Sequence, residues 1–479
     1  MFWRSAGFTQ PSPIEGILER DNFTLEDILD EDDVIQECKS LNSRLIVFLR
    51  DRGVIEKLIR YLVEPPPEDA DVKRRYKYPY VACEIFTCEV DALFSAIFEG
   101  TELLDLLFSL LDRPAPLPSV LAGYFAKVMN SMLSRRTSDS MLYLQGRQHL
   151  LGNLVKHLGT TSVAEVVMQL VGADEQILMF HAESLQWLAD TSLLELILDS
   201  LAPENSPTTH ANAAEVLTSI ARTLPSALAN QLGSPMYLQR LFQHAQAPGS
   251  ACQQSLVLDV CMALLDPKRA TLFSRCSHGF MDSSDQGAQT GPPANLIACC
   301  LSQLESLVPQ LNSNEEKKIQ YTTYGQLFPP LGTLRLKIVE FLSVLVRAVV
   351  YHSPALKDEL QAEVLRLDAV HKCLALFFQY PFHSLLHNHV DGLLMAILES
   401  GQDELLSHLL VRCKLLEALS TAPEKVKPKG GKMEMRAGNM GHVTRLSNKI
   451  QDLAAQGCEV LAEATKGSGQ WREGGEGGE

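Results

Sequence analysis

"LDLLFSLL", residues 104–111, places apolar side chains at its first, fourth, fifth and eighth positions, and this pattern returns along the chain at a nearly constant spacing. The other copies are "IEKLIRYL" (55–62), "LGNLVKHL" (151–158), "LELILDSL" (194–201) and "LQRLFQHA" (238–245). Their starting points are 49, 47, 43 and 44 residues apart. Apolar residues three and four positions apart share one face of an α-helix, so each copy predicts an amphipathic helix.

A sixth copy, "VHKCLALF" (370–377), begins 132 residues after the fifth, which equals three intervals of 44, and a partial copy, "LEAL", begins at Leu416. A period of about 40 to 47 residues is typical of armadillo and HEAT-like repeats, whose helices bury their apolar faces by stacking. We therefore predict an all-α, armadillo/HEAT-like helical-repeat solenoid. The alternative is that leucine-rich helices match so loose a pattern by chance.

The composition limits the kinds of partner. Lysine and arginine total 42 against 58 acidic residues, a net charge of −16, which repels nucleic acids and anionic lipid surfaces. Polar residues interrupt the N-terminus, and the apolar stretch "IVEFLSVLVRAVVY" (338–351) is too short and too charged to span a bilayer. Eleven scattered cysteines without an export signal indicate a reducing compartment. We expect a cytoplasmic location, with the nucleus as a further compartment.

Proline, glycine and charge mark the expected boundaries. Residues 1–455 are expected to form one repeat domain, with flexible loops at about 277–293 and 422–437. The Gly/Glu-rich residues 456–479 are expected to be a disordered tail.

The segment "RRYKYPYVACEIFTCEV" (74–90) combines a basic run, a proline and two cysteines. Pro79 suits the first turn of a helix, so a helix is expected from Tyr78 or Pro79 onward. Cys83 and Cys88 are five residues apart and would lie about 140° apart around that helix, which excludes a shared ion and favours buried thiols. The basic run is either a solvated flank or a surface for an acidic partner.

"KYPYVACEIFTCEV" also resembles the SAPS-domain family, the regulatory subunits of type 6 (Sit-four-like) serine/threonine protein phosphatases. Further matching segments keep the family's order from residue 1 to about 455, and the opening "MFWRSAGFT" is most similar to the plant or algal branch. They are "MFW", "TLEDILDEDDVIQECKSLNSRLIVFL" from Thr24, "VLAGYFAKVMNSMLSRR" from Val120, "HLGTTSVAEVVMQLV" from His157, "PPLGTLRLKIVEFL" from Pro329, "LALFFQYPFHSLLHNHV" from Leu374 and "GNMGHVTRLSNKI" from Gly438.

The resemblance implies a non-catalytic helical scaffold that binds a type 6 phosphatase catalytic subunit and directs its substrate choice, often with an ankyrin-repeat third subunit. Family members continue into a long acidic tail, whereas this sequence ends in a Gly/Glu segment. On the family-like segments we predict partner-binding residues: Arg74, Arg75, Lys77, Tyr78, Glu84, Arg335, Asn439, Met440, His442 and Arg445. For the segment from Gly438 the alternative is a structural entry into the last helix, and for Arg335 it is a capping role.

Other motifs favour structure over chemistry. The sequence lacks nucleotide-binding, hydrolase, zinc-protease and C-x-x-C motifs, as well as the metal-binding motifs of phosphatase catalytic subunits. His383 and His387 could share a helix face, but without a paired carboxylate at the usual position we expect a histidine cluster rather than a zinc site. The adjacent Cys299 and Cys300 point to different faces and are expected in the core. We expect no enzyme activity, metal or cofactor.

"DEDD" (30–33) is expected to cap or solvate a helix, and the alternative is a contact for a basic partner. Two other classes of protein remain open: a solenoid adaptor for cargo or cytoskeletal partners without a phosphatase, and an unrecognised metal-dependent enzyme. The identity of the co-purifying protein would separate the first from a phosphatase regulator, and elemental analysis would test the second.

Overall fold

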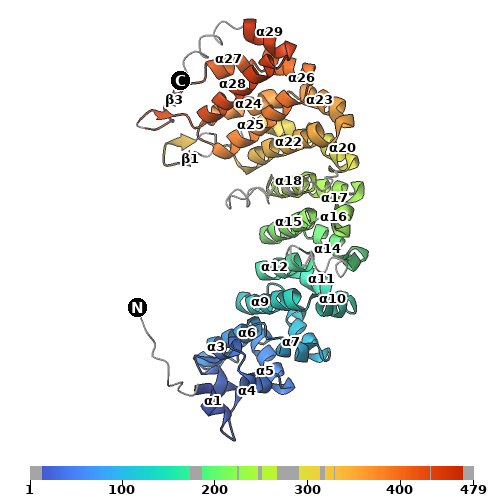
Figure 1. Ribbon diagram of the computed structural model, residues 1–479, viewed down its shortest axis with the longest axis vertical. Coiled ribbons are helices and arrows are strands. Elements are labelled where there is room, and N and C mark those ends of the chain that lie inside the picture. Colours follow the sequence, from blue (N-terminus) through green and yellow to red (C-terminus); the bar gives the residue numbers. More distant parts are fainter. Residues whose placement is uncertain are drawn as a thin grey trace. The chain divides into compact units, whose positions relative to one another are not determined.

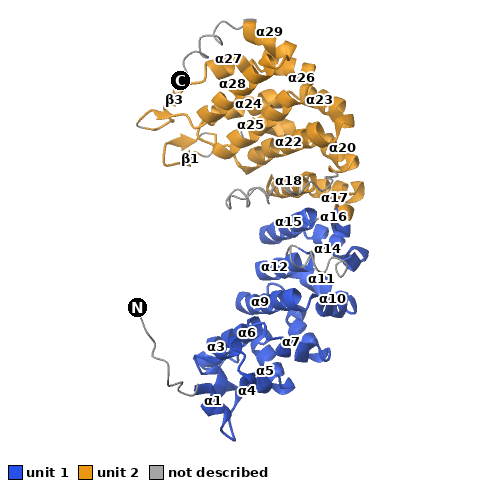
Figure 2. Ribbon diagram, in the orientation of Figure 1, with its two compact units in different colours: residues 1–229 blue, residues 230–479 orange. Residues whose placement is uncertain are grey.

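The computed structural model describes residues 13–172, 186–223, 226–245, 251–266, 291–312, 319–327, 329–431 and 433–467. The chain forms two compact units, residues 1–229 (unit 1) and 230–479 (unit 2), shown separately in Figure 2. Both are built almost entirely of helices, which confirms the predicted all-α class.

Unit 1 is a succession of short helices joined by tight turns (Figure 1). The helices are α1 (Pro13–Leu18), α2 (Leu25–Leu29), α3 (Val34–Lys39), α4 (Ser43–Leu49), α5 (Arg52–Val63), η1 (Lys73–Lys77), α6 (Tyr78–Thr87), α7 (Asp91–Phe98), α8 (Glu102–Phe108), η2 (Ser109–Asp112), α9 (Ser119–Arg135), α10 (Thr137–Gln145), α11 (His149–Lys156), α12 (Thr161–Leu170), η3 (Gln186–Asp190), α14 (Leu193–Asp199) and α15 (Pro207–Arg222); α16 (Ala227–Leu232) contains the boundary between the units.

Unit 2 repeats this style with longer helices and two small hairpins. Its elements are α17 (Pro235–Ala245), α18 (Ala251–Leu265), α20 (Ala294–Ser302), α21 (Leu304–Leu307), η4 (Val308–Asn312), β1 (Gln320–Tyr321), β2 (Gln326–Leu327), α22 (Thr333–His352), η5 (Pro354–Leu356), α23 (Lys357–Arg366), α24 (Ala369–Gln379), α25 (Ser384–Glu399), α26 (Asp403–Ser407), η6 (His408–Arg412), α27 (Leu415–Ser420), β3 (Lys425–Val426), β4 (Met435–Arg436), α28 (Met440–Ala455) and α29 (Glu459–Gly467).

Within each unit the helices form two stacked rows. In unit 1 one row runs α6, α9, α12, α15, and the other runs α5, α8, α11, α14, with α11 also contacting η2. In unit 2 a row of long helices runs α18, α22, α25, α28, and α17, α20, η4 and α24 pack beside it. Because each helix contacts mainly its neighbours in sequence order, each unit has the organisation of a helical-repeat solenoid.

The repeated apolar pattern marks one of these rows. Its six copies fall on α5, α8–η2, α11, α14, α17 and α24, and every apolar position of the pattern is at most 6% exposed. Between the fifth and the sixth copy, the sequence shows no intervening copy that can be identified. A copy near residue 326 would fall on β2, which is a strand, and a copy near residue 282 lies outside the described residues.

Long-range polar contacts repeat at the same spacing. Lys127 bonds to Glu84 at 2.5 Å across 43 residues, and Arg412 bonds to Asp368 at 2.9 Å across 44. The buried His157 contacts the carbonyl oxygen of Leu111 at 2.9 Å across 46 residues. Each repeat is therefore tied to the next by polar bonds as well as by its apolar face, and the bonds satisfy groups that stacking would otherwise bury unpaired.

Two expected boundaries need correction. Residues 459–467 of the expected tail form α29, which packs on α28 and buries Leu461, so the helical region extends past 455, while 468–479 lie outside the described residues. The expected loop 422–437 contains the β3–β4 hairpin. Of the expected loop 277–293, only 291–293 are described. Within the described ranges, no helix is long and apolar enough to cross a bilayer.

Candidate partner-binding surfaces

The family-like segment of unit 1 spans η1 and α6. The helix begins at Tyr78 with Pro79 in its first turn, as predicted, and η1 is one wider turn of π-helix that leads directly into it. Single π-helical turns are frequent at functional sites. Tyr78 and Pro79 point into the core, whereas Tyr76 and Tyr80 are 67% and 50% exposed.

The basic run of η1 is largely paired within the chain. Lys73 Nζ lies 2.7 Å from Asp30 Oδ2, and Lys77 Nζ lies 2.6 Å from the Asp30 carbonyl oxygen and 3.4 Å from Asp32 Oδ1. The acidic run "DEDD" thus meets a basic surface of its own chain. The sequence left open an acidic partner for the basic run and a basic partner for the acidic run. In the structure, these two runs form ion pairs with each other.

The two arginines of the run also make internal contacts. The Arg74 guanidinium lies 4.4 Å from the centroid of the Tyr61 ring, and Arg75 donates to the carbonyl oxygen of Glu68. Tyr78, 8% exposed, packs against Tyr61, and burial raises the pKa of its phenol. Of these predicted partner-binding residues, Arg75 is exposed, Arg74 and Lys77 are half-buried, and Tyr78 is buried.

Exposed and half-buried tyrosine and valine side chains lie on η1 and on the neighbouring helices α6 and α9. We call Tyr76, Tyr80, Val120 and Tyr124 the tyrosine patch; Val120 is 61% exposed and Tyr124 is half-buried. Burial chiefly raises the pKa of the Tyr124 phenol, and Tyr80 is near enough to contribute. Tyrosines that bury a ring and keep a polar tip are enriched in protein interfaces.

The tyrosine patch is framed by contacts between the two helices. Glu84, a predicted partner-binding residue, pairs with Lys127, and the Cys83 thiol contacts the Tyr124 carbonyl oxygen at 3.9 Å. The helices are therefore fixed relative to each other, so the patch is presented on a rigid surface. The sequence analysis included Glu84 but missed Tyr80, Val120 and Tyr124, which lie in family-like segments and interrupt the buried faces of their helices.

The second family-like region, in unit 2, centres on a buried carboxylate. Asp391 on α25 is 2% exposed, and its Oδ2 lies 2.7 Å from Arg445 Nη1 on α28. His442 Nδ1 lies 3.6 Å from Asp391 Oδ1. The structure thus brings together the predicted residues His442 and Arg445, and the Arg445 side chain remains 61% exposed.

The remaining predicted residues are mainly structural. Asn439 is buried and donates to the Phe377 carbonyl oxygen at 3.5 Å, and Met440 is half-buried at the start of α28. Arg335 is 8% exposed and donates to the carbonyl oxygens of Leu331 at 2.7 Å and Pro330 at 2.5 Å. Backbone carbonyls bind its guanidinium, and the contact of Arg335 with a partner stays a prediction.

The histidine cluster is dispersed over different contacts. His383 Nδ1 accepts the Leu386 amide at 3.2 Å, while His387 donates from Nε2 to the Tyr380 carbonyl oxygen at 2.8 Å. His389 faces Glu340 at 3.9 Å. Among the described residues, no group of three or more His, Cys, Asp or Glu side chains could hold a metal ion.

The cysteines singled out in the sequence differ in burial. Cys83 and Cys300 are fully buried, as expected, whereas Cys88 and Cys299 are only half-buried. Cys88 hydrogen-bonds with the buried Cys38 of α3, a contact that lowers the pKa of Cys88.

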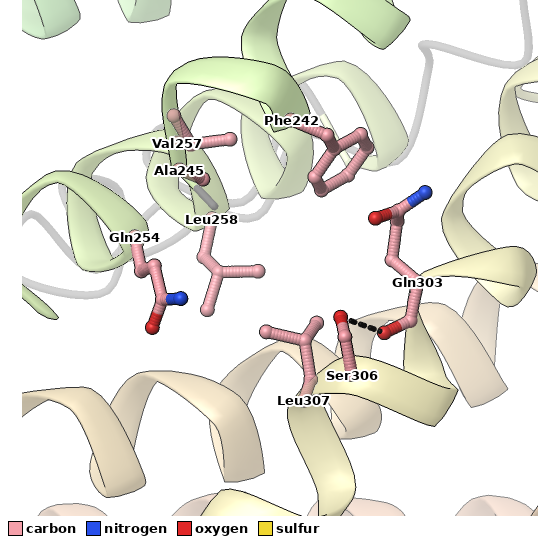
Figure 3. A pocket seen from close by; sticks show the side chains of 8 residues that line it. All are labelled: Phe242, Ala245, Gln254, Val257, Leu258, Gln303, Ser306 and Leu307. Carbon is pink, nitrogen blue, oxygen red and sulfur yellow. Dashed lines mark hydrogen bonds between the residues drawn. The ribbon is translucent and has the colours of Figure 1, made fainter. Parts of the chain in front are cut away.

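One small hollow opens in unit 2 beside α17, α18 and α21 (Figure 3). Its lining combines apolar side chains with amides and one hydroxyl: Phe242, Ala245, Gln254, Val257, Leu258, Gln303, Ser306 and Leu307. The Ser306 hydroxyl donates to the Gln303 carbonyl oxygen at 2.9 Å. No lining side chain is an acid or a base.

Comparison with known proteins gives a consistent result. The profile described as "SIT4 phosphatase-associated protein" (SAPS) matches residues 129–351 and 346–472. The chain is 28% identical to serine/threonine-protein phosphatase 6 regulatory subunit 3 of Gallus gallus over 94% of this chain and 54% of that protein. It is 29% identical to regulatory subunit 1 of Mus musculus, over 97% of this chain and 58% of that protein.

The chain therefore spans little more than half the length of these curated relatives. Its similarity to them extends over nearly all its residues, in agreement with the resemblance seen in the sequence. The assignment to a plant or algal branch stays a prediction. Because the profile matches well over half of the chain, the protein belongs to the SAPS family of SIT4 phosphatase-associated proteins.

Proposed function

We propose that this chain is a non-catalytic regulatory subunit that binds the catalytic subunit of a type 6 serine/threonine protein phosphatase and directs its substrate choice. Family membership and the printed names of the relatives, phosphatase 6 regulatory subunits, support the proposal. The stacked helices also suit a scaffold, since solenoids present extended surfaces to other proteins.

The observation that carries the proposal at the level of residues is the tyrosine patch. Two neighbouring helices in family-like segments expose tyrosine and valine side chains, where a solvated helix face would carry polar groups. The adjacent Glu84–Lys127 pair supplies a polar rim. An apolar centre with a polar rim is the common anatomy of a protein interface.

The experiment is a titration of the purified chain with purified type 6 catalytic subunit by calorimetry. Tyr80→Ser combined with Val120→Ser should weaken binding by about 2 kcal/mol, or about thirtyfold, because aromatic anchors dominate interface energies. Both side chains are at least 50% exposed, so the fold should be retained.

The matched control replaces two equally exposed apolar residues elsewhere, Leu142→Ser with Met236→Ser, which are 70% and 60% exposed. This control should bind like the unaltered chain. Absence of binding by the unaltered chain would reject the phosphatase proposal. Normal binding by the Tyr80/Val120 variant would reject only the patch, and leave the phosphatase partner in place.

An ankyrin-repeat third subunit, and a cytoplasmic and nuclear location, complete the proposal, supported by the family resemblance and the cysteine usage. Affinity purification of the tagged chain with mass spectrometry tests the first, and fluorescence imaging of the tagged chain tests the second. Reproducible recovery of cargo or cytoskeletal proteins without a phosphatase would favour the adaptor function instead.

A further inference from the structure

The two hairpins of unit 2 form a small rigid module. The Gln326 amide of the β1–β2 hairpin donates to the Lys429 carbonyl oxygen of the β3–β4 hairpin at 2.8 Å. The Ala437 amide donates to the Glu424 carbonyl oxygen at 2.9 Å, and the Tyr324 ring packs against Phe382 with centroids 4.9 Å apart. The Gly438 amide donates to the Pro381 carbonyl oxygen at 2.9 Å, so the module is attached to the segment between α24 and α25.

The turn between β3 and β4 depends on glycine. Gly430 has a φ of +74°, which favours glycine, and a side chain there would meet Gln326 at 3.2 Å. A side chain at Gly431 would come within 3.0 Å of the carbonyl oxygens of Pro428 and Tyr324. The close approach of the two backbones fixes the hairpin in one conformation.

This hairpin is basic in a strongly acidic protein. Residues 424–436 contain five lysines and arginines against two glutamates, whereas the whole chain carries a net charge of −16. Lys425, Lys427 and Arg436 are exposed. The local charge is therefore opposite to that of the molecule that carries it.

The strand register places like charges side by side. Lys425 is paired with Arg436, so two cations lie directly opposite each other on the same face of the hairpin. Directly opposed like charges destabilise a hairpin. Continuing the register places Glu434 opposite Lys427, which leaves Lys425 and Arg436 as the unbalanced pair. An anion that binds between these two cations would remove the repulsion between them.

Exposed apolar side chains also lie on the two hairpins. Met433 and Met435 are 73% and 41% exposed, and Tyr321 of the neighbouring hairpin is 74% exposed. Methionine adapts to varied partners, and exposed aromatic and methionine side chains are favoured at interfaces. Because successive side chains of a strand point to opposite faces, Met435 lies on the opposite face of the hairpin from Lys425 and Arg436, and the cation pair itself carries the proposed site.

We propose that the cationic face of the β3–β4 hairpin, centred on Lys425 and Arg436, binds an acidic, extended segment of a partner protein. A membrane surface or a nucleic acid is extended and carries negative charge. It would lie close to much of this molecule, whose net charge of −16 repels it. A peptide contacts the hairpin alone, and charges beyond about 8–10 Å are screened at physiological ionic strength. The proposal does not depend on the phosphatase, because the peptide binds this chain directly.

The test uses the full chain and a fluorescein-labelled peptide of glutamates interrupted by phenylalanines, followed by fluorescence anisotropy at low and at physiological salt. Lys425→Glu should weaken binding on the order of tenfold, since one attraction is lost and one repulsion is added. The same substitution should not lower the melting temperature, because it converts the opposed cations into an opposite-charge pair.

The control is Lys57→Glu, which makes the same charge change on an exposed position of α5 in unit 1. It should leave peptide binding unchanged. Equal weakening by both variants, or no binding by the unaltered chain at low salt, would overturn the proposal. Vesicles containing phosphatidylserine should not bind; tighter binding to vesicles than to the peptide, lost in Lys425→Glu, would replace the peptide by a membrane and also overturn it.

Discussion

His387 lies in the interior of unit 2 with its ring wholly buried. Burial chiefly lowers its pKa, to about 4, and the bond to the Tyr380 carbonyl opposes that shift only in part. The imidazole is therefore neutral at physiological pH and acts as a packed aromatic donor between Phe377 and Tyr380. Its role is structural, as expected from the interpretation of this segment as a packed histidine cluster.

This neutral histidine makes stability depend on pH. As pH falls below about 6.5, the unfolded chain takes up a proton at this position, while the folded chain resists it until about pH 4, so the free energy of unfolding should fall by up to about 3 kcal/mol over that interval. Denaturant unfolding of the full chain at about pH 7 and about pH 5 measures the loss. His387→Phe should flatten this dependence, and His149→Phe, at an exposed position, should not. An identical pH dependence in both variants would contradict the assignment.

The cysteines should differ in reactivity. Burial raises the pKa of Cys83 to about 12, whereas the hydrogen bond from Cys38 lowers the pKa of the half-buried Cys88. Iodoacetamide reacts with thiolates, so Cys88 should be alkylated well before Cys83 in the folded chain. Peptide mass spectrometry over a time course measures both rates, with the exposed Cys252 as a reference for accessibility. Equal rates at Cys83 and Cys88 would show that the thiol pair does not control reactivity.

At the level of single residues, the sequence did not show which side chains make contacts within the chain. The sequence analysis treated "DEDD" and the basic run of η1 as two separate surfaces, yet Asp30 pairs with Lys73 across 43 residues. Local patterns contain no information about such a partner. The repeat spacing did contain this information, because opposite charges that are one period apart become neighbours when the repeats stack. Arg335 shows the other limit, since its carbonyl partners depend on the backbone path before α22.

Helix α28 is attached to α25 by apolar contacts and by one buried carboxylate. Val443, Leu446 and Ile450 form its buried face, and Asp391 holds Arg445 and His442. Removing one partner of a buried ion pair costs more than removing an exposed pair, because the remaining charge stays unpaired or must be hydrated. The predicted partner-binding residues of this segment therefore depend on Asp391 for their position.

Asp391→Ala should loosen α28 by about 2 kcal/mol of local stability, through loss of the buried acceptor for Arg445. Hydrogen exchange of α28 measures the change. Glu19→Ala, which removes an exposed partner of Arg44, is the matched control and should alter exchange little. If α28 exchanges at the same rate in both variants, Asp391 does not hold the helix, and its apolar face and the Lys449–Glu399 ion pair do.

Periodicity predicted the elements well wherever the repeat is regular. The six copies of the apolar pattern lie on helices and their apolar positions are buried, because stacking places the same face inward in every repeat. Prediction was weaker where the repeat is interrupted: the sequence did not indicate the β1–β2 hairpin, and the expected flexible loop 422–437 contains a hairpin held by its neighbour. Two-residue strands have no periodic signature of their own.

At the scale of the whole molecule, neighbour-to-neighbour stacking determines how a local defect spreads. Phe125 of α9 is fully buried and packs edge-on against Phe108 at 5.7 Å, while Phe341 is fully buried in α22 of unit 2. In repeat proteins stability is approximately a sum of repeat and nearest-neighbour terms. A cavity should therefore weaken its own repeat and the adjacent ones.

Phe125→Ala should cost about 3–5 kcal/mol, and the loss should raise hydrogen exchange in α6, α9 and α12 while α22 and α25 keep their protection. Phe341→Ala is the matched control and should give the reverse pattern, because α22 stacks on α18 and α25. Hydrogen exchange with mass spectrometry on the intact chain distinguishes the two. Equal loss of protection in both units after either substitution would mean that the chain unfolds as one cooperative body. If the loss is confined to one unit, the two units unfold independently. A partner bound to one unit would then stabilise the repeats of that unit without ordering the other.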